Sequence, residues 1–146
     1  MTLEIHPGQG LGNLKFGMTM SEVGSILGQE KDRSIRDEVT ELYFENYLNL
    51  AFRDGALFQI GATRYTEGIT YENIDIFLAE PLSVLKAMET DAGGAFEMYG
   101  FIVFLKLGVS LTGFHDDDLE NKALTVAVLE EWQALRNELT PISFLS

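Results

Sequence analysis

The sequence predicts an α+β fold of two tandem helix-plus-antiparallel-meander repeats, which form one sheet with both helices on one face. Three observations predict it. Ten Phe and five Tyr favour a sheet over an all-helical bundle. Short runs of alternating apolar and polar residues indicate half-buried strands. The order strand, helix and meander occurs twice along the chain.

The 146 residues are expected to form a single domain, 1–146, that is large enough to bury a core. Within it, the first repeat spans about 13–64, the second about 73–129, and a closing helix about 130–139. Each half has too few strands to be stable alone, so the two are expected to join their sheets. The opposite face of that sheet is then a natural binding surface.

The sequence predicts both ends of the first helix. Thr19 is a suitable N-cap, and Glu22 stands three residues later, where its side chain can complete a capping box. An apolar face follows from the helical spacing of Met20, Val23 and Leu27. Gly28 supplies the left-handed residue that commonly ends a helix.

The first meander is expected to consist of strands at Thr40–Glu45, Tyr47–Arg53 and Ala56–Thr63. Asp54-Gly55 joins the last two, and this pair strongly indicates a type I′ hairpin turn. The polar segment Gln29–Glu38 and the glycine-rich segment Ile5–Asn13 are expected to be loops.

The second half is expected to begin with a linker, Tyr65–Asn73, and to repeat the same order of elements. Pro81 suits the first position of a second helix, which ends before Gly93-Gly94. The remaining expected elements are strands at Ile74–Leu78, Phe96–Gly100, Phe101–Leu107, Val109–Phe114 and Lys122–Leu129, and a closing helix that Pro141 ends.

The charge balance argues against some partners. With 23 acidic and 10 basic residues, the net charge is −13, which repels nucleic acid and anionic lipid. Such a surface attracts a basic protein partner and accelerates the encounter, although solubility alone also accounts for it. There is no Cys, which excludes disulfides, thiol catalysis and thiolate zinc sites. The first residues lack the basic and apolar regions of a signal peptide, and Gly100–Leu111 is too short to span a bilayer, so a cytoplasmic location is expected.

The segment Phe16–Gly28 resembles a motif of small bacterial helix-plus-meander proteins, F-G-M-S/T-x-x-E-V-x-x-x-L-G. That motif recurs in outer-membrane-assembly lipoprotein domains, in domains similar to the β-lactamase-inhibitor protein and in cytoplasmic toxin-immunity proteins. The residues at the matching positions are Phe16, Gly17, Met18, Thr19, Glu22, Val23, Leu27 and Gly28. The chain lacks the lipidated Cys of the lipoproteins and the disulfides of the inhibitors. The resemblance therefore implies the immunity type, in which an acidic protein masks a basic toxin domain.

Two groups of residues are candidates for binding. Tyr43 and Tyr99 are expected on the open face of the sheet, where a half-exposed structural role is the alternative. The acidic run after His115 is expected to be a solvated loop. The candidate binding residues in it are Asp116, Asp117, Asp118 and Glu120. The run lacks the glycine and late glutamate of an EF-hand, so no metal site is predicted.

The remaining motifs do not indicate a nucleotide-binding or catalytic site. Gly8-x-Gly10-x-Gly12 departs from a dinucleotide-binding loop in its spacing, and no serine stands in a nucleophile elbow. No cofactor is therefore predicted. Trp132 is expected to buttress the core, with a binding role as the alternative.

The leading hypothesis is a non-enzymatic acidic binding protein, an immunity protein that neutralises a basic bacterial toxin. The alternative is a small ligand-binding or enzymatic domain with a pocket between sheet and helices. A third hypothesis is a structural module that pairs through a sheet edge. A monomer and a homodimer are both compatible with the sequence.

Overall fold

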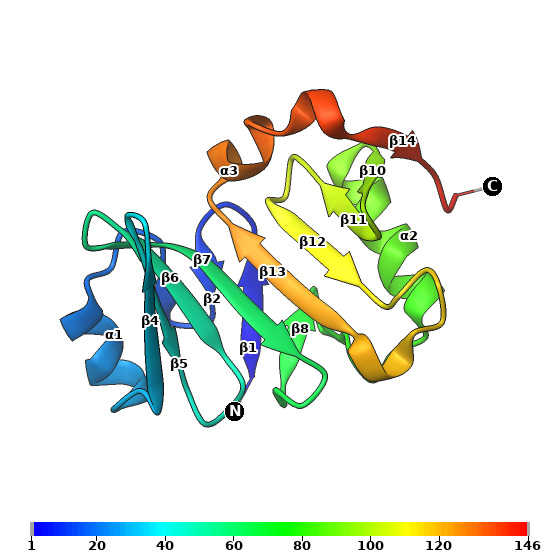
Figure 1. Ribbon diagram of the computed structural model, residues 1–146. Helices are drawn as coiled ribbons and strands as arrows, with labels where there is room; N and C mark the ends of the chain where they lie inside the picture. The colour runs from blue at the N-terminus through cyan, green and yellow to red at the C-terminus, as the bar shows by residue number, and fades with distance from the viewer. Residues whose placement is uncertain (1, 146) are drawn as a thin grey trace.

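The computed structural model describes residues 2–145, and its fold is α+β, as the sequence predicts. The prediction of one sheet is wrong, because the strands form two sheets: an antiparallel sheet of nine strands and a mixed sheet of five (Figure 1). Two strands of the smaller sheet, Gly10–Leu11 and Ile69–Tyr71, lie in segments predicted as a loop and a linker, whereas Ile74–Asp75 lies in a predicted strand.

The nine-stranded sheet has the order β14-β10-β11-β12-β13-β7-β6-β5-β4. Its centre is the antiparallel pair of β7 and β13, in which Ile60 lies opposite Val126. The strand bounds are β4 Asp32–Arg36, β5 Val39–Tyr43, β6 Asn49–Arg53, β7 Ala56–Thr63, β10 Ala95–Met98, β11 Phe101–Phe104, β12 Val109–Thr112, β13 Ala123–Ala127 and β14 Thr140–Ile142.

The five-stranded sheet has the order β3-β2-β1-β8-β9. Its one parallel pair joins β1 to β8, with Leu3 opposite Ile69. Gly10 is required in β2, because a Cβ there would lie 2.0 Å from the Leu14 carbonyl oxygen. The strand bounds are β1 Leu3–His6, β2 Gly10–Leu11, β3 Leu14–Lys15, β8 Ile69–Tyr71 and β9 Ile74–Asp75.

The helices are α1 (Met20–Leu27), α2 (Pro81–Ala92) and the short α3 (Leu129–Gln133), and 3₁₀ turns occupy Leu119–Asn121 and Arg136–Glu138. The capping box of α1 is confirmed. Thr19 Oγ1 accepts from the Glu22 N–H at 3.1 Å, and Glu22 Oε1 accepts from the Thr19 N–H at 2.9 Å. The predicted closing helix 130–139 is too long, because the chain passes from α3 into a 3₁₀ turn.

Both edge strands of the larger sheet lie where the sequence predicts no strand. All five residues of β4 are exposed, so the apolar alternation that marks a half-buried strand is missing from Gln29–Glu38. β14 contains Pro141, which lacks a backbone N–H and is tolerated in a sheet chiefly at an edge.

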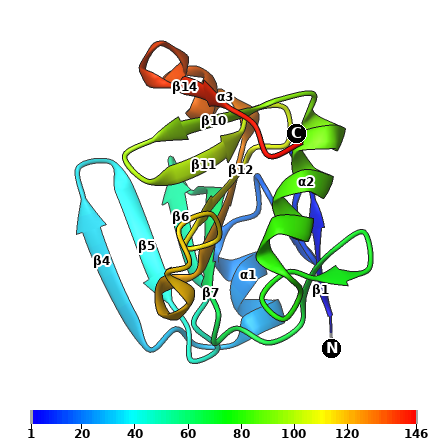
Figure 2. The same cartoon turned by 90° about the vertical axis from the view of Figure 1, so that its right-hand side faces the viewer.

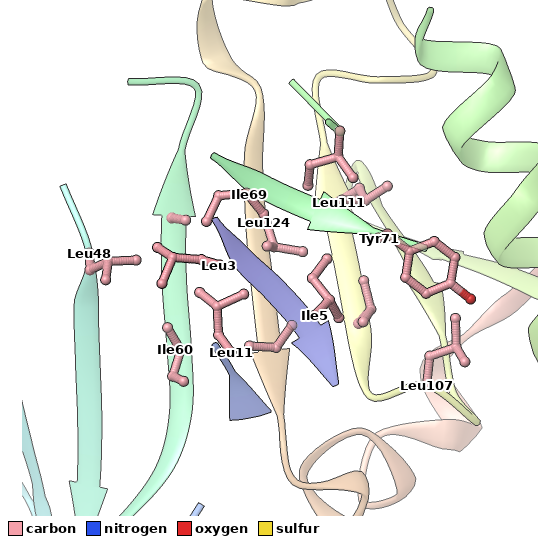
Figure 3. Close-up of a cluster of buried hydrophobic side chains, with 14 of the residues drawn as sticks. Leu3, Ile5, Leu11, Leu48, Ile60, Ile69, Tyr71, Leu107, Leu111 and Leu124 are labelled. Carbon is pink, nitrogen blue, oxygen red and sulfur yellow. The ribbon is translucent and has the colours of Figure 1, made fainter. Parts of the chain in front are cut away.

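The core lies between the two sheets. Figure 3 shows Leu3, Ile5 and Leu11 from the smaller sheet pointing toward Ile60 and Leu124 of the larger one. All five side chains are at most 7% exposed and belong to one cluster that also holds Val23 of α1 and Val84, Leu85 and Met88 of α2. The helices α1 and α2 lie on the same side of the larger sheet as the smaller sheet (Figure 2). No helix within residues 2–145 is both long enough and apolar enough to cross a bilayer.

Candidate functional site

One end of the nine-stranded sheet gathers the predicted binding residues. In an antiparallel sheet the connections alternate between the two ends, so β5–β6, β7–β8, β10–β11 and β12–β13 all turn at the same end. We call this end, with the segment that enters β4, the loop end. Its residues come from five connections far apart in the sequence.

The acidic loop, residues 113–122, is the longest of these connections. Asp116, Asp117 and Glu120 are exposed, and Asp118 holds the loop in shape. Both carboxylate oxygens of Asp118 accept from Asn121 Nδ2 at 3.0 Å, and its carbonyl accepts from the Asn121 N–H at 3.0 Å. The loop is therefore ordered by its own hydrogen bonds while it presents three further carboxylates to solvent.

The two predicted tyrosines lie at the loop end but are not neighbours. Tyr43 is the last residue of β5, and its hydroxyl donates to Glu41 Oε2 at 3.2 Å. Tyr99 lies in the β10–β11 turn and is 84% exposed. Five strand spacings separate β5 from β11, which amounts to about 24 Å. The structure therefore does not bring Tyr43 and Tyr99 together into one site.

A pocket of about 320 Å³ opens on the outer face of the sheet at the loop end, beside Tyr43. Side chains alternate along a strand, so the outer face carries the residues next to the core-facing Ile60, Ala62 and Leu124. The outward residues that line the pocket on β7 and β13 are small. They are Gly61, Thr63, Ala123 and Thr125.

The shape of the pocket follows from one row of paired residues. Tyr43 lies opposite Asn49, Asn49 opposite Gly61, and Gly61 opposite Thr125 on successive strands. The ring of Tyr43 forms one wall of the pocket, and the missing side chain of Gly61 leaves space in its floor. The Asn49 side chain leans over Gly61, so that a Cβ there would lie 2.0 Å from Asn49 Oδ1. The pocket is therefore a consequence of the order of side-chain sizes across four strands.

Two cations and two tyrosines form a row that begins in the wall of this pocket, which Lys31 and Tyr47 line, and continues outside it with Tyr65 and Arg64. Lys31 Nζ lies 5.6 Å from the ring centroid of Tyr47, whose ring centroid is 5.5 Å from that of Tyr65. The Arg64 guanidinium stacks on Tyr65 at 4.6 Å, and its Nη2 donates to the Tyr65 hydroxyl at 2.6 Å. We call these four residues the cation–tyrosine row. Within residues 2–145, neither cation has a carboxylate at ion-pair distance.

The cation–tyrosine row was not predicted from the sequence. Its members come from the segment before β4, the β5–β6 turn and the β7–β8 connection, so nothing local links them. One signal was present in the sequence, since Gly61 inside a strand pattern indicates a close approach of another group. The φ of 66° at Tyr47, which is uncommon for a residue with a side chain, is visible only in the structure.

A second charged cluster lies at the edge of the smaller sheet. Burial, and then the hydrogen bond that Tyr71 donates to Asp91 Oδ2 at 2.5 Å, raise the pKa of Tyr71 above its ordinary range. Repulsion from Asp91 is the main cause that raises the pKa of the neighbouring Glu72. Glu4 fixes this corner by accepting from the Thr70 hydroxyl and the Glu72 N–H. No group of three or more His, Asp or Glu side chains in the described chain has the geometry to hold a metal ion.

The remaining candidates from the sequence lie elsewhere. His115 lines a hollow with Glu80, the N-cap of α2, and with Phe144, and its Nδ1 is buried without a hydrogen-bond partner in residues 2–145. Trp132 on α3 is only partly buried, but its Nε1–H is buried without a hydrogen-bond partner in residues 2–145. The nearby Arg53 stacks on Phe58 at 4.1 Å and pairs with Glu131 at 2.5 Å, which ties α3 to the sheet.

Comparison with solved structures yields a similar fold. No family model and no curated protein matches the chain. Among solved structures, the chain is similar to a cysteine-rich secretory protein from Staphylococcus aureus, with a TM-score of 0.51 and 11% sequence identity. The match covers 100% of this chain and 56% of that protein, so the chain spans little more than half of its length. At this identity the likeness shows the fold alone.

The structural match corrects the resemblance inferred from the sequence. The assignment to proteins similar to the β-lactamase-inhibitor protein and the outer-membrane-assembly lipoproteins, of the toxin-immunity type, is wrong, because the fold that matches over the full chain is a different one. The physical reason is that the motif of 16–28 encodes a capped helix. Such a helix is a local structure that unrelated folds share.

Proposed function

We propose that this protein is a non-enzymatic binding domain that engages a basic protein partner through the acidic loop at its loop end. The observation that carries the proposal is a preorganised loop whose exposed carboxylates are left without counter-ions. Asp116, Asp117 and Glu120 have no ion-pair partner within residues 2–145, while Asp118 orders the loop. A loop that is already ordered loses less conformational entropy when it binds.

The charge of the whole chain supports the same partner chemistry. The described part of the chain contains only two ion pairs, Arg33–Glu30 at 2.8 Å and Arg53–Glu131 at 2.5 Å, against 23 acidic residues in the sequence. Most of the negative charge is therefore not neutralised within the fold. Charge of one sign over a surface raises the rate at which an oppositely charged protein is captured.

The architecture is compatible with this function. We propose, as a finer account of the fold, that 13–64 and 73–129 are two copies of one unit. The strand order supports it, since the next four strands after α1 and after α2 are neighbours in the nine-stranded sheet, and the two sets meet at the β7–β13 pair. Joining two sets of strands in this way places the acidic loop at the same end of the sheet as three shorter connections.

The test compares two variants that each lose three carboxylates. In the loop variant, Asp116→Asn, Asp117→Asn and Glu120→Gln are combined, and Asp118 is kept because it orders the loop. The control variant combines Glu38→Gln, Asp54→Asn and Glu130→Gln, which lie in the β4–β5 turn, the β6–β7 turn and α3, at the opposite end of the sheet. Each protein is immobilised and exposed to a lysate of the native host, and the captured protein is then purified and titrated against all three forms.

We expect a basic protein that binds the wild-type chain in a 1:1 complex, with an affinity that falls as salt is added. The loop variant is expected to bind it at least about tenfold more weakly, and the control variant to bind within about twofold of wild type. Equal binding by the two variants, or no basic protein captured at low salt, contradicts the proposal. Neutralisation of a toxin is one case of this function, and co-expression with the captured protein tests it by the survival of the host.

A further inference from the structure

We infer that the pocket on the outer face of the sheet is a binding site for a small aromatic carboxylate, with Lys31 as the residue that recognises the anionic group. This inference is separate from the proposed function, because it concerns another part of the loop end and a ligand of the opposite charge. The pocket, its lining and the cation–tyrosine row carry it together.

The lining of the pocket is the first step. None of the described residues that line it is Asp or Glu, although the sequence contains 23 of them, and its one charged side chain is Lys31. A carboxylate that enters the pocket therefore meets an ammonium group and no like charge in the walls. A charge-assisted hydrogen bond to an anion is stronger than one between neutral groups.

The state of Lys31 is the second step. Its ammonium lies over the Tyr47 ring at 5.6 Å and has no carboxylate partner within residues 2–145. Contact with the ring places the cation at the rim without neutralising it. The ring of Tyr47 is in turn held by Tyr65, on which Arg64 stacks. Arg64 and Tyr65 are outside the lining of the pocket, so the positive charge in its described walls is that of Lys31.

The shape of the floor indicates the rest of the ligand. A volume of about 320 Å³ is at the lower end of the range for small-molecule sites. The floor is made of small side chains around Gly61, and the ring of Tyr43 stands at one wall. A flat aromatic body fits such a hollow, where it covers backbone and packs beside tyrosine. The Asn49 amide over Gly61 is placed to hydrogen-bond a polar substituent.

Three probes of similar size separate charge from shape: benzoate, benzyl alcohol and benzylamine. Each is titrated into the full chain up to about 10 mM while backbone amide shifts are recorded by NMR. We expect benzoate to shift the amides of Asn49, Gly61 and Thr125, benzyl alcohol to bind more weakly at the same place, and benzylamine to bind weakest. Inorganic phosphate in a fourth titration distinguishes recognition of an aromatic carboxylate from recognition of any anion.

Two variants test the residues. Lys31→Gln is expected to weaken benzoate binding about tenfold and to leave benzyl alcohol unchanged. Lys86→Gln, an exposed lysine of α2, is the matched control and should bind as wild type. Gly61→Ala introduces a Cβ that displaces Asn49 into the pocket, so it should weaken both probes without unfolding the protein, since Gly61 is outside the left-handed region.

The outcomes decide the inference. No saturable benzoate shift at the loop end, equal binding of benzoate and benzylamine, or a Lys31→Gln variant that binds like Lys86→Gln each overturns it. Phosphate binding as tight as benzoate binding overturns the inference that the ligand is aromatic. Because these readouts do not involve Asp116, Asp117 or Glu120, failure here leaves the proposed function standing, and the converse also holds.

Discussion

The buried carboxylate of Glu89 on α2 accepts a hydrogen bond from the Ser143 hydroxyl at 2.7 Å and so holds the C-terminal segment against the helix. Its second oxygen accepts from the Phe144 N–H at 2.7 Å. The residues just before this anchor form β14, which covers the edge of β10. A glutamate that is 5% exposed is thus satisfied by two donors that lie more than fifty residues further along the chain.

Glu89→Gln is expected to lower the free energy of unfolding by about 2 kcal/mol, since hydrogen bonds to a charged group are worth about 1.5–3 kcal/mol. It should also increase hydrogen exchange in 95–97 and 140–145, because release of the anchor exposes the β10 edge. Denaturant unfolding and exchange measured by mass spectrometry check this. Glu130→Gln, on the exposed surface of α3, is the control, and equal stability of the two variants contradicts the prediction.

Tyr71 predicts a loss of stability in alkali. Its pKa is raised in the folded protein, chiefly by burial and then by its bond to Asp91. The folded state therefore holds the phenolic proton more tightly than the unfolded state, so stability falls once the pH exceeds about 10. Tyr71→Phe keeps the ring and removes the titration. We expect its thermal midpoint to decline less steeply than that of wild type between about pH 9 and 11, whereas parallel curves contradict this.

Glu72 predicts a change in stability at acidic pH. Repulsion from Asp91 raises its pKa above the ordinary value of 4.5, so its contribution to stability is present below that value and is lost as the pH rises through the raised pKa. Glu72→Gln removes the repulsion. We expect the variant to have a higher thermal midpoint than wild type at pH 7 and the same midpoint at about pH 3. Glu67→Gln is the control, and a pH-independent difference for Glu72→Gln contradicts the explanation.

Two turn glycines are expected to differ in their tolerance of a side chain. Gly55 and Gly108 have φ values of +78° and +67°, but only Gly108 is also crowded. A Cβ there would lie 2.4 Å from the Ala127 carbonyl oxygen, whereas nothing lies within 4 Å of a Cβ at Gly55.

Gly55→Ala is therefore expected to cost about 1 kcal/mol, from backbone conformation alone. Gly108→Ala should cost about 3 kcal/mol, because overpacking adds to the same backbone term. Urea unfolding of the two variants measures both values. A larger loss of unfolding free energy for Gly55→Ala than for Gly108→Ala contradicts the argument from crowding at Gly108.

The capping box of α1 provides a local test. Thr19→Ala removes the acceptor for the Glu22 N–H and should cost about 1 kcal/mol in unfolding free energy. Ser25→Ala is the matched control. Ser25 lies inside α1, where its hydroxyl bonds the Ser21 carbonyl, and alanine has the higher helix propensity. We expect Ser25→Ala to be neutral or slightly stabilising, and a larger loss there than at Thr19 contradicts the assignment of the cap.

Part of the candidate site was accessible from the sequence. The acidic loop was predicted as a solvated connection, and Tyr43 as a residue of the outer face. The pocket beside Tyr43 was not predicted, because it depends on which strands become neighbours. Thr125 lines it only because β13 pairs with β7, and Lys31 only because the segment before β4 ends beside the β5–β6 turn. Neither relationship has a local signature.

The sequence by itself determined the structures that short-range interactions stabilise. The box at Thr19 and the Asp54-Gly55 turn each depend on residues within a few positions of one another, and each is confirmed. Only the tertiary structure decided how the sheets are divided and what the loop end contains. The exposed edge β4 and the glycine-rich strands β1 and β2 have weak local preferences, so they become strands through pairing with distant partners. The capped helix is likewise compatible with many folds, and the packing of residues far apart in the chain selects one of them.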